Sequence, residues 1–179
     1  IREKITVSPG IKYTNTMNAL VFSRNTINLL GSAKKMDFFD IVPDAHTKIT
    51  TYSVKTSLTP KGKWGVDGDF ALNDGEWNKS GNIPFLSDFE LGAHGFVTPF
   101  EKWTFHCLMR VFGKHYVEDG SDDKIDPFVK IDLKAETVLS KYLDMNFELR
   151  NITNSKGFWW TERYRIPGIG IYAGLSAKY

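Results

Sequence analysis

The sequence predicts an all-β protein, an antiparallel up-and-down β-barrel or a large part of one, with about 8–10 strands. Three observations predict it. Apolar and polar residues alternate with a period of two along most of the chain, and no segment sustains a period of 3.6. Short turns alternate with long polar connections. No stretch approaches the roughly 18 apolar residues of a membrane-spanning helix, so only strands could cross a bilayer.

The composition is that of one domain, or part of one, with balanced charge. The 179 residues hold 23 Lys and Arg against 21 Asp and Glu without a basic run, and we expect no nucleic-acid partner. The single cysteine, Cys107, excludes an internal disulfide and a thiolate metal cluster. The chain opens within a strand-like pattern, IREKITVSPG, and we expect a mature form or a piece of a longer chain.

The first part of the chain predicts one strand, a long connection and one hairpin. Apolar residues alternate through 5–13, and 17–23 repeats the pattern more weakly. Residues 24–47 have the character of a long connection with an apolar segment inside it. A hairpin follows, with 52–58 and 64–70 as its strands.

The second part predicts two more hairpins and a final strand. The second hairpin pairs 89–97 with 103–111, the third pairs 129–139 with 143–150, and the final strand covers 169–179. The first two hairpins share a Thr-Pro turn followed by Lys-Trp, in LTPKGKWGV and VTPFEKWTF. Proline fixes φ at such a turn and cannot join a ladder of hydrogen bonds.

Long polar connections alternate with these short turns. They contain runs such as NDGEWNKSGN and VEDGSDDKIDP, and they cover 72–87, 114–127 and 152–166. Tight turns on one side and long loops on the other are typical of outer-membrane barrels. We expect the carboxylates of the second run to lie in a solvated loop, because they lack the full ligand pattern of a calcium site.

The charged residues allow the strand register to be predicted. If Leu139 faces Leu143, two residues of the third hairpin are partners when their residue numbers have the same sum as 139 and 143. The same rule gives the partners in the other two hairpins. Opposite charges then meet on the polar face of each hairpin. The predicted pairs are Lys134–Glu148, Asp132–Arg150, Glu90–Arg110 and Lys55–Asp67.

The two faces of the predicted sheet differ enough in polarity to show which face meets water. The polar face of the third hairpin is charged at nearly every position, so the apolar face must be the one removed from water. A soluble barrel or sandwich would bury that face in its core and could bind a small apolar ligand. An outer-membrane barrel would turn it towards lipid and keep the charges in its lumen. Both alternatives predict the same alternation of apolar and polar residues, so the alternation alone does not distinguish them.

Strand length and the placement of aromatic residues favour lipid. The strands reach about ten residues, which is longer than is usual in soluble sheets. Aromatic residues gather at strand ends, where the interfaces of a bilayer would lie. These residues are Trp64, Phe100, Trp103, Tyr142 and Tyr179.

No motif for catalysis or for a cofactor is present. The sequence has no HExxH, GxSxG or Walker loop, and we expect no enzyme activity, no cofactor and no metal site. His94 and His106 fall opposite each other in the predicted register. Two imidazoles without a third ligand are too few to hold a metal.

The segment GFWWTERYR, from Gly157, is the strongest candidate for ligand binding. Flat aromatic surfaces beside an arginine are the residues that dominate recognition sites. An interfacial aromatic cluster followed by part of a strand is the alternative. The candidate binding residues, in loops or lumen, are Trp159, Trp160, Arg163, Tyr164, His115 and Tyr116.

The order of these pieces resembles the C-terminal barrel strands of TonB-dependent outer-membrane receptors. FELGAHGFVTPFEKWTFHCLMRVFGKHYVEDG is followed by PFVKIDLKAETVLSKYLDMNFELRNITN and then by IPGIGIYAGLSAKY. In that family the penultimate hairpin often ends in an Asn-Leu-x-Asp/Asn-like segment, here NITN. The final strand often begins with Pro-Gly and ends in an aromatic residue, as it does here.

The resemblance implies that residues 1–179 are the C-terminal part of one transmembrane barrel in a Gram-negative type of outer membrane. The plug domain and the segment that contacts TonB would lie outside this chain. The implied function is energised uptake of a large, scarce ligand such as a siderophore-like metal chelate. The implied partners are the lipid bilayer, the plug domain, TonB and that chelate.

Overall fold

The computed structural model describes residues 4–28, 35–59, 63–77, 81–83, 86–116, 124–157 and 165–178. Within these ranges the chain is all β and contains no helix, which confirms the predicted class. The strands in chain order are β1 (Lys4–Asn28), β2 (Lys35–Thr59), β3 (Trp64–Trp77), β4 (Gly81–Asn82), β5 (Phe89–Phe100), β6 (Trp103–Phe112), β7 (His115–Tyr116), β8 (Lys124–Ile125), β9 (Phe128–Ser140), β10 (Leu143–Arg150) and β11 (Gly170–Ala177).

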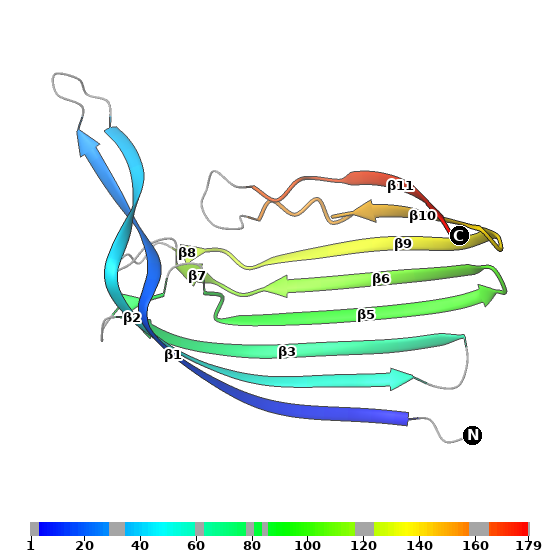
Figure 1. The fold of residues 1–179 in the computed structure, drawn as a ribbon, viewed down its shortest axis with the longest axis horizontal. Helices are drawn as coiled ribbons and strands as arrows, with labels where there is room; N and C mark the ends of the chain where they lie inside the picture. The colour runs from blue at the N-terminus through cyan, green and yellow to red at the C-terminus, as the bar shows by residue number, and fades with distance from the viewer. Residues whose placement is uncertain are drawn as a thin grey trace.

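Eight strands form one antiparallel sheet in the order β1-β2-β3-β5-β6-β9-β10-β11. The short β4 pairs with β3, and β7 pairs with β8 in a separate ribbon. Spatial order follows chain order, which is the arrangement of an up-and-down barrel. Within the described residues β1 and β11 are the edges of an open sheet (Figure 1).

The two ends of the sheet differ in their connections. Figure 1 shows the tight turns β5–β6 and β9–β10 at one end of the sheet, where β1 and β3 begin and β2 and β11 end. β7, β8 and the described parts of the longer connections lie at the opposite end, which we call the loop end. Tight turns at one end and long loops at the other is the layout that the sequence predicts.

β1 and β2 are longer than predicted. The described part of residues 24–47 is strand rather than connection, since β1 continues to Asn28 and β2 begins at Lys35. β3 follows β2 only as far as Thr47. The hairpin of β1 and β2 therefore extends beyond the other strands at the loop end as a twisted ribbon (Figure 1).

The sequence pattern missed these strands because residues 23–28 and 35–42 do not alternate. Residues 23–28 are polar except for Ile27, and the apolar residues of the second segment lie next to each other at 38–39 and 41–42. The register of β1 against β2 shifts between Thr16 and Ala19 and shifts back between Ala19 and Val21, so the pairs on either side of Ala19 keep the same register. The backbone stays paired because its hydrogen bonds do not depend on side-chain type.

The predicted register holds along most of the third hairpin and fails by two positions in the others. Next to the third turn Leu143 lies opposite Ser140 and not opposite Leu139 as predicted, because the register shifts between Leu143 and Asp144. Lys134 lies opposite Glu148, as predicted. In the first hairpin Lys55 lies opposite Asp69, so its predicted pairing with Asp67 is wrong.

The second hairpin shows the cause of the error. Glu90 lies opposite Phe112, so the predicted pair of Glu90 with Arg110 is also wrong. β5 continues through Pro99 to Phe100, which pairs with Trp103, and a register shift separates this pair from Val97 opposite Phe105. The prediction placed Val97 opposite Trp103 and so left out the residues that the end of β5 and the start of β6 add before the turn. A shift of two leaves every side chain on its predicted face.

One face of the sheet is apolar from strand to strand. A single row of cross-strand partners on it runs through Val54, Phe70, Leu91, Val111 and Val129. These side chains are not covered by the described residues: Phe70 is 38% exposed and Val129 37%. Contiguous exposed apolar surface of this extent marks a face that is made for a non-aqueous neighbour.

The small core of the described residues lies at the loop end instead of beneath the sheet. Its buried apolar side chains are Trp77, Ile125, Phe128 and Ile166. The Phe128 ring stacks on Phe112 with the ring centroids 4.8 Å apart. The described ranges contain no membrane-spanning helix.

Candidate functional site

The face opposite the apolar one is charged and hydrogen-bonded, and it forms the first part of the candidate site. On β3 and β6 an ion pair crosses the strand between them. Arg110 Nη1 lies 3.4 Å from Asp69 Oδ2, and Gly92 of β5 is the residue paired with both. A Cβ on Gly92 would collide with the Asp69 carboxylate. Glycine is therefore what allows the ion pair to pass over β5.

The ion pairs of the third hairpin run along strands more than across them. Lys134 contacts Glu136, and Arg150 Nε donates to Glu148 Oε1 at 2.8 Å. The β9–β10 ladder ends at Leu133 and Leu149, so Asp132 and Arg150 are not ladder partners, and Asp132 Oδ2 contacts Lys130 Nζ at 2.7 Å. On an extended strand, residues two apart share a face, which allows long side chains to meet their second neighbours. The Arg150 guanidinium also lies over the Tyr172 ring, 4.3 Å from its centroid.

His94 and His106 come together on the same charged face. Their rings are nearly parallel, at 9°, and His94 Nε2 lies 3.1 Å from His106 Nδ1. They are diagonal neighbours and not the direct partners that were predicted, because His94 pairs with Leu108. Asp67 lies 3.5 Å from His94 Nδ1, and Glu136 lies 3.5 Å from His106 Nε2.

These four side chains form a row across β3, β5, β6 and β9, with a hydrogen bond between the two imidazoles and a carboxylate 3.5 Å from each ring. Each nitrogen of the two rings faces a different neighbour, so the lone pairs do not converge on one point. Among the described residues no group of three or more His, Cys, Asp or Glu side chains is placed to hold a metal ion.

The loop end forms the second part of the candidate site, and it contains two of the predicted binding residues. His115 is only 4% exposed, and its Nδ1 donates a long hydrogen bond to the Gly113 carbonyl, 3.4 Å away. Burial lowers the pKa of His115 from its ordinary value, so the neutral imidazole is favoured. The Tyr116 ring is covered by the Lys124 ammonium, 4.4 Å from its centroid. His115 is therefore a buried residue of the loop end.

The other predicted binding residues, Trp159, Trp160, Arg163 and Tyr164, lie outside the described residues. Two residues that the sequence analysis did not single out shape the described site. Gly92 carries the signal of a glycine inside a strand, which marks a close approach. Asn151 follows directly on β10 and is fully buried, with 0% exposure.

Comparison with known proteins identifies the fold. No protein-family model matches the sequence, and no curated protein matches it. Solved structures match over nearly the whole chain. The copper transporter OprC matches with a TM-score of 0.74 and 13% identity, over 98% of this chain and 29% of that one.

Two solved receptors give the same result. The ferric-catecholate import receptor Fiu from K12 E. coli matches with a TM-score of 0.65 and 10% identity, over 97% of this chain and 25% of that one. The pyoverdine outer-membrane receptor FpvA from Pseudomonas aeruginosa PAO1, bound to pyoverdine, matches with a TM-score of 0.65 and 12% identity, over 98% and 27%.

The chain spans between 25% and 29% of the length of these three proteins. Identities this low establish the fold alone. The sequence resemblance is confirmed at that level, because these neighbours are receptors and transporters of the TonB-dependent kind. The chain has the fold of a section of the β-barrel of TonB-dependent outer-membrane receptors.

Proposed function

We propose that this chain forms part of the wall of an outer-membrane receptor that takes up a large, scarce ligand such as a metal chelate. The observation that carries the proposal is the two-sided sheet. Its apolar face is exposed and continuous across the strands, while its other face holds a network of charges. In a barrel the first face meets lipid and the second lines the lumen. The neighbouring folds include a copper transporter and a ferric-catecholate receptor.

The rest of the transport machinery would lie outside these residues. We assign them to the C-terminal part of one barrel domain, in a Gram-negative type of outer membrane. The plug domain and the TonB-contacting segment belong to other parts of the polypeptide. Binding would use His115 and Tyr116 at the loop end together with the aromatic and guanidinium side chains of Trp159, Trp160, Arg163 and Tyr164. This chain would supply wall and loops, with no catalysis and no cofactor.

A spin label on Cys107 tests the lipid-facing part of this proposal. Cys107 is exposed and lies on the apolar face of β6, whereas the next residue, Leu108, lies on the charged face. In vesicles, a label on Cys107 should collide often with oxygen, which concentrates in lipid, and rarely with a water-soluble nickel chelate. A label at position 108, introduced by the double substitution Cys107→Ser and Leu108→Cys, should show the reverse.

The outcomes separate the alternatives, because a residue in a soluble core meets neither reagent. If Cys107 is shielded from oxygen and from nickel alike, the apolar face packs against protein and the lipid assignment is wrong. Paramagnetic relaxation of the two labels, each in the whole polypeptide, gives both accessibilities for each position.

Uptake by cells that produce the whole polypeptide tests the transport part. We expect radiolabelled ferric catecholate, ferric pyoverdine or Cu²⁺ to accumulate, and a protonophore to abolish accumulation. Trp160→Ala should raise the half-saturating concentration, since truncation of a recognition tryptophan costs at least about 1–2 kcal/mol. Trp64→Ala, at the tight-turn end, is the matched control and should leave uptake unchanged. Accumulation that persists without the proton gradient would contradict energised transport.

A further inference from the structure

Asn151 occupies an unusual place at the loop end, directly after β10. Its backbone is left-handed, with φ at 51°, a conformation that asparagine tolerates better than most residues. Its side chain is completely buried although it is polar. Burial of an amide is favourable only when its hydrogen-bonding groups are satisfied.

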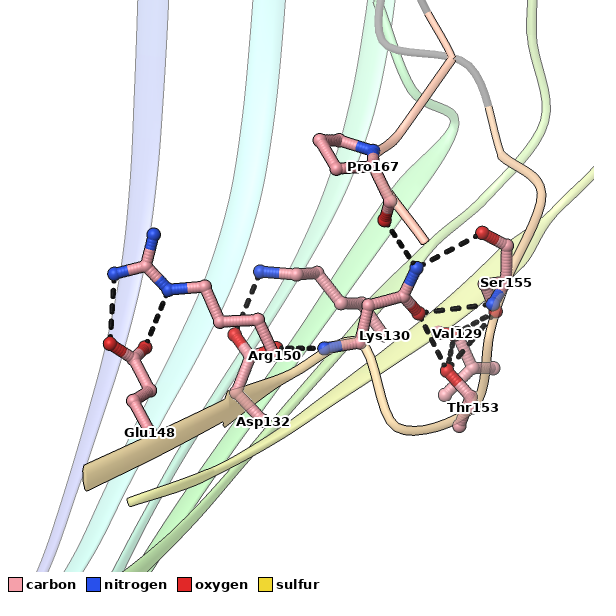
Figure 2. A network of polar contacts seen from close by, with 9 residues as sticks. Val129, Lys130, Asp132, Glu148, Arg150, Thr153, Ser155 and Pro167 are labelled. Atoms are coloured by element: carbon pink, nitrogen blue, oxygen red, sulfur yellow. Dashed lines mark hydrogen bonds and ion pairs between the residues drawn. The ribbon is translucent and has the colours of Figure 1, made fainter. Parts of the chain in front are cut away.

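The amide of Asn151 is satisfied on both sides. Figure 2 shows its partners Thr153, Ser155 and Pro167. Its oxygen Oδ1 accepts from Ser155 N and from Thr153 Oγ1, both at 3.0 Å. Its nitrogen Nδ2 donates to the carbonyls of Ser155, at 3.2 Å, and Pro167, at 2.8 Å. The Asn151 backbone N–H donates to Asp132 Oδ1 at 2.7 Å, which ties the network to β9. Two donors and two acceptor positions are the full capacity of a carboxamide.

These bonds join two stretches that are distant in sequence. Ser155 belongs to the chain that leaves β10, whereas Pro167 belongs to the chain that returns to β11. The same two stretches meet again where Ile166 N donates to the Gly157 carbonyl at 2.9 Å. Gly157 has no room for a side chain, because a Cβ there would collide with the Phe128 ring.

The outgoing and returning stretches are the two stems of the segment 158–164. We propose that Asn151 is a positioning residue that fixes the spacing of these stems, and that it does so through the Pro167 carbonyl. The inference deepens the proposed function and rests on it in one respect, since the segment between the stems carries the residues assigned to ligand binding. The stem geometry itself is independent of any ligand.

Two substitutions separate the halves of the Asn151 network. In Asn151→Asp the carboxylate still accepts from Ser155 N–H and Thr153, but it can donate to neither the Ser155 carbonyl nor the Pro167 carbonyl. In Asn151→Gly the left-handed backbone is retained and all side-chain bonds are lost. Asn146→Asp makes the same chemical change on β10, where the side chain lies over Gly174, and is the matched control.

Amide hydrogen exchange, resolved by residue in the whole polypeptide in detergent micelles, is the test. In Asn151→Asp the Ile166 amide should exchange roughly tenfold faster or more, while the Ser155 amide keeps its protection. In Asn151→Gly both amides should lose protection. The ladder amides of Phe147 and Ser176 should not change in either variant.

Two results would overturn the inference. Unchanged protection of Ile166 in Asn151→Asp would show that the Pro167 carbonyl does not set the stem spacing. An equal loss of protection at Phe147 and Ser176 would make Asn151 a general stability determinant instead of a positioning residue. Neither result depends on ligand uptake, so the proposed function can fail while this inference stands, and the reverse.

Discussion

Replacing Leu133 with arginine should lower the free energy of unfolding in lipid vesicles by about 2–4 kcal/mol, the cost of a cation near the midplane of a bilayer. Leu133 lies in the middle of β9, between Cys107 of β6 and Leu149 of β10. All three side chains lie on the apolar face, so a guanidinium there has no charged partner on the neighbouring strands. Denaturant titration of the protein folded in vesicles measures the difference.

Leu108→Arg is the matched control for Leu133→Arg. Leu108 and Leu133 have the same residue type and the same exposure, 38%. Leu108 lies on the charged face instead, with Asp132 as its cross-strand partner. A new guanidinium would meet a carboxylate there, so stability should change little. Equal losses in the two variants would mean that the faces do not differ in their surroundings, and the lipid-facing assignment would fail.

The sequence alone predicts which face each strand residue occupies, because the side-chain period of a strand is two. In the third hairpin this alternation also predicts the register, with Lys134 opposite Glu148. In the first two hairpins the partners are displaced by two positions. A displacement of two conserves the faces but changes the partners, so the alternation cannot detect it. The length of chain consumed by each turn decides the register, and hydrophobicity does not report that length.

The longest strands were missed for a different reason. Residues 23–28 of β1 are almost all polar, and β2 has adjacent apolar residues at 38–39 and 41–42, so neither segment alternates. A backbone ladder forms without alternation because its hydrogen bonds are independent of side-chain type. Residues that the pattern assigns to a connection can therefore still be strand.

The polar network of the site was only partly predictable. His94 and His106 meet despite the error in register, because diagonal neighbours remain within reach of long side chains. The role of Asn151 could not be derived from alternation, since it depends on the Pro167 carbonyl, which the chain brings back only after the β10–β11 connection. Contacts between segments distant in sequence are fixed by the fold and leave no periodic signal.

Gly92→Val should destabilise the folded protein by about 1–3 kcal/mol, the usual cost of forcing extra atoms into a filled space. Gly92 lies beneath the Asp69 carboxylate, and any Cβ there must displace it. The displaced Asp69 carboxylate can then no longer reach Arg110 across β5. The pair itself contributes little, because both side chains are more than a third exposed. Most of the expected loss comes from steric overlap, and denaturant titration measures it.

Gly95→Val on the same strand supplies the opposite expectation. A Cβ on Gly95 would make ordinary contact, 3.9 Å from the Gly65 carbonyl oxygen. Valine suits a strand better than glycine does, so this variant should be neutral or more stable by up to about 1 kcal/mol. Adding Asp69→Ala to Gly92→Val should recover most of the lost stability, because the displaced carboxylate is then absent. If the double variant is as unstable as Gly92→Val alone, the Asp69 carboxylate does not lie over β5, and the register of β3 against β5 is wrong.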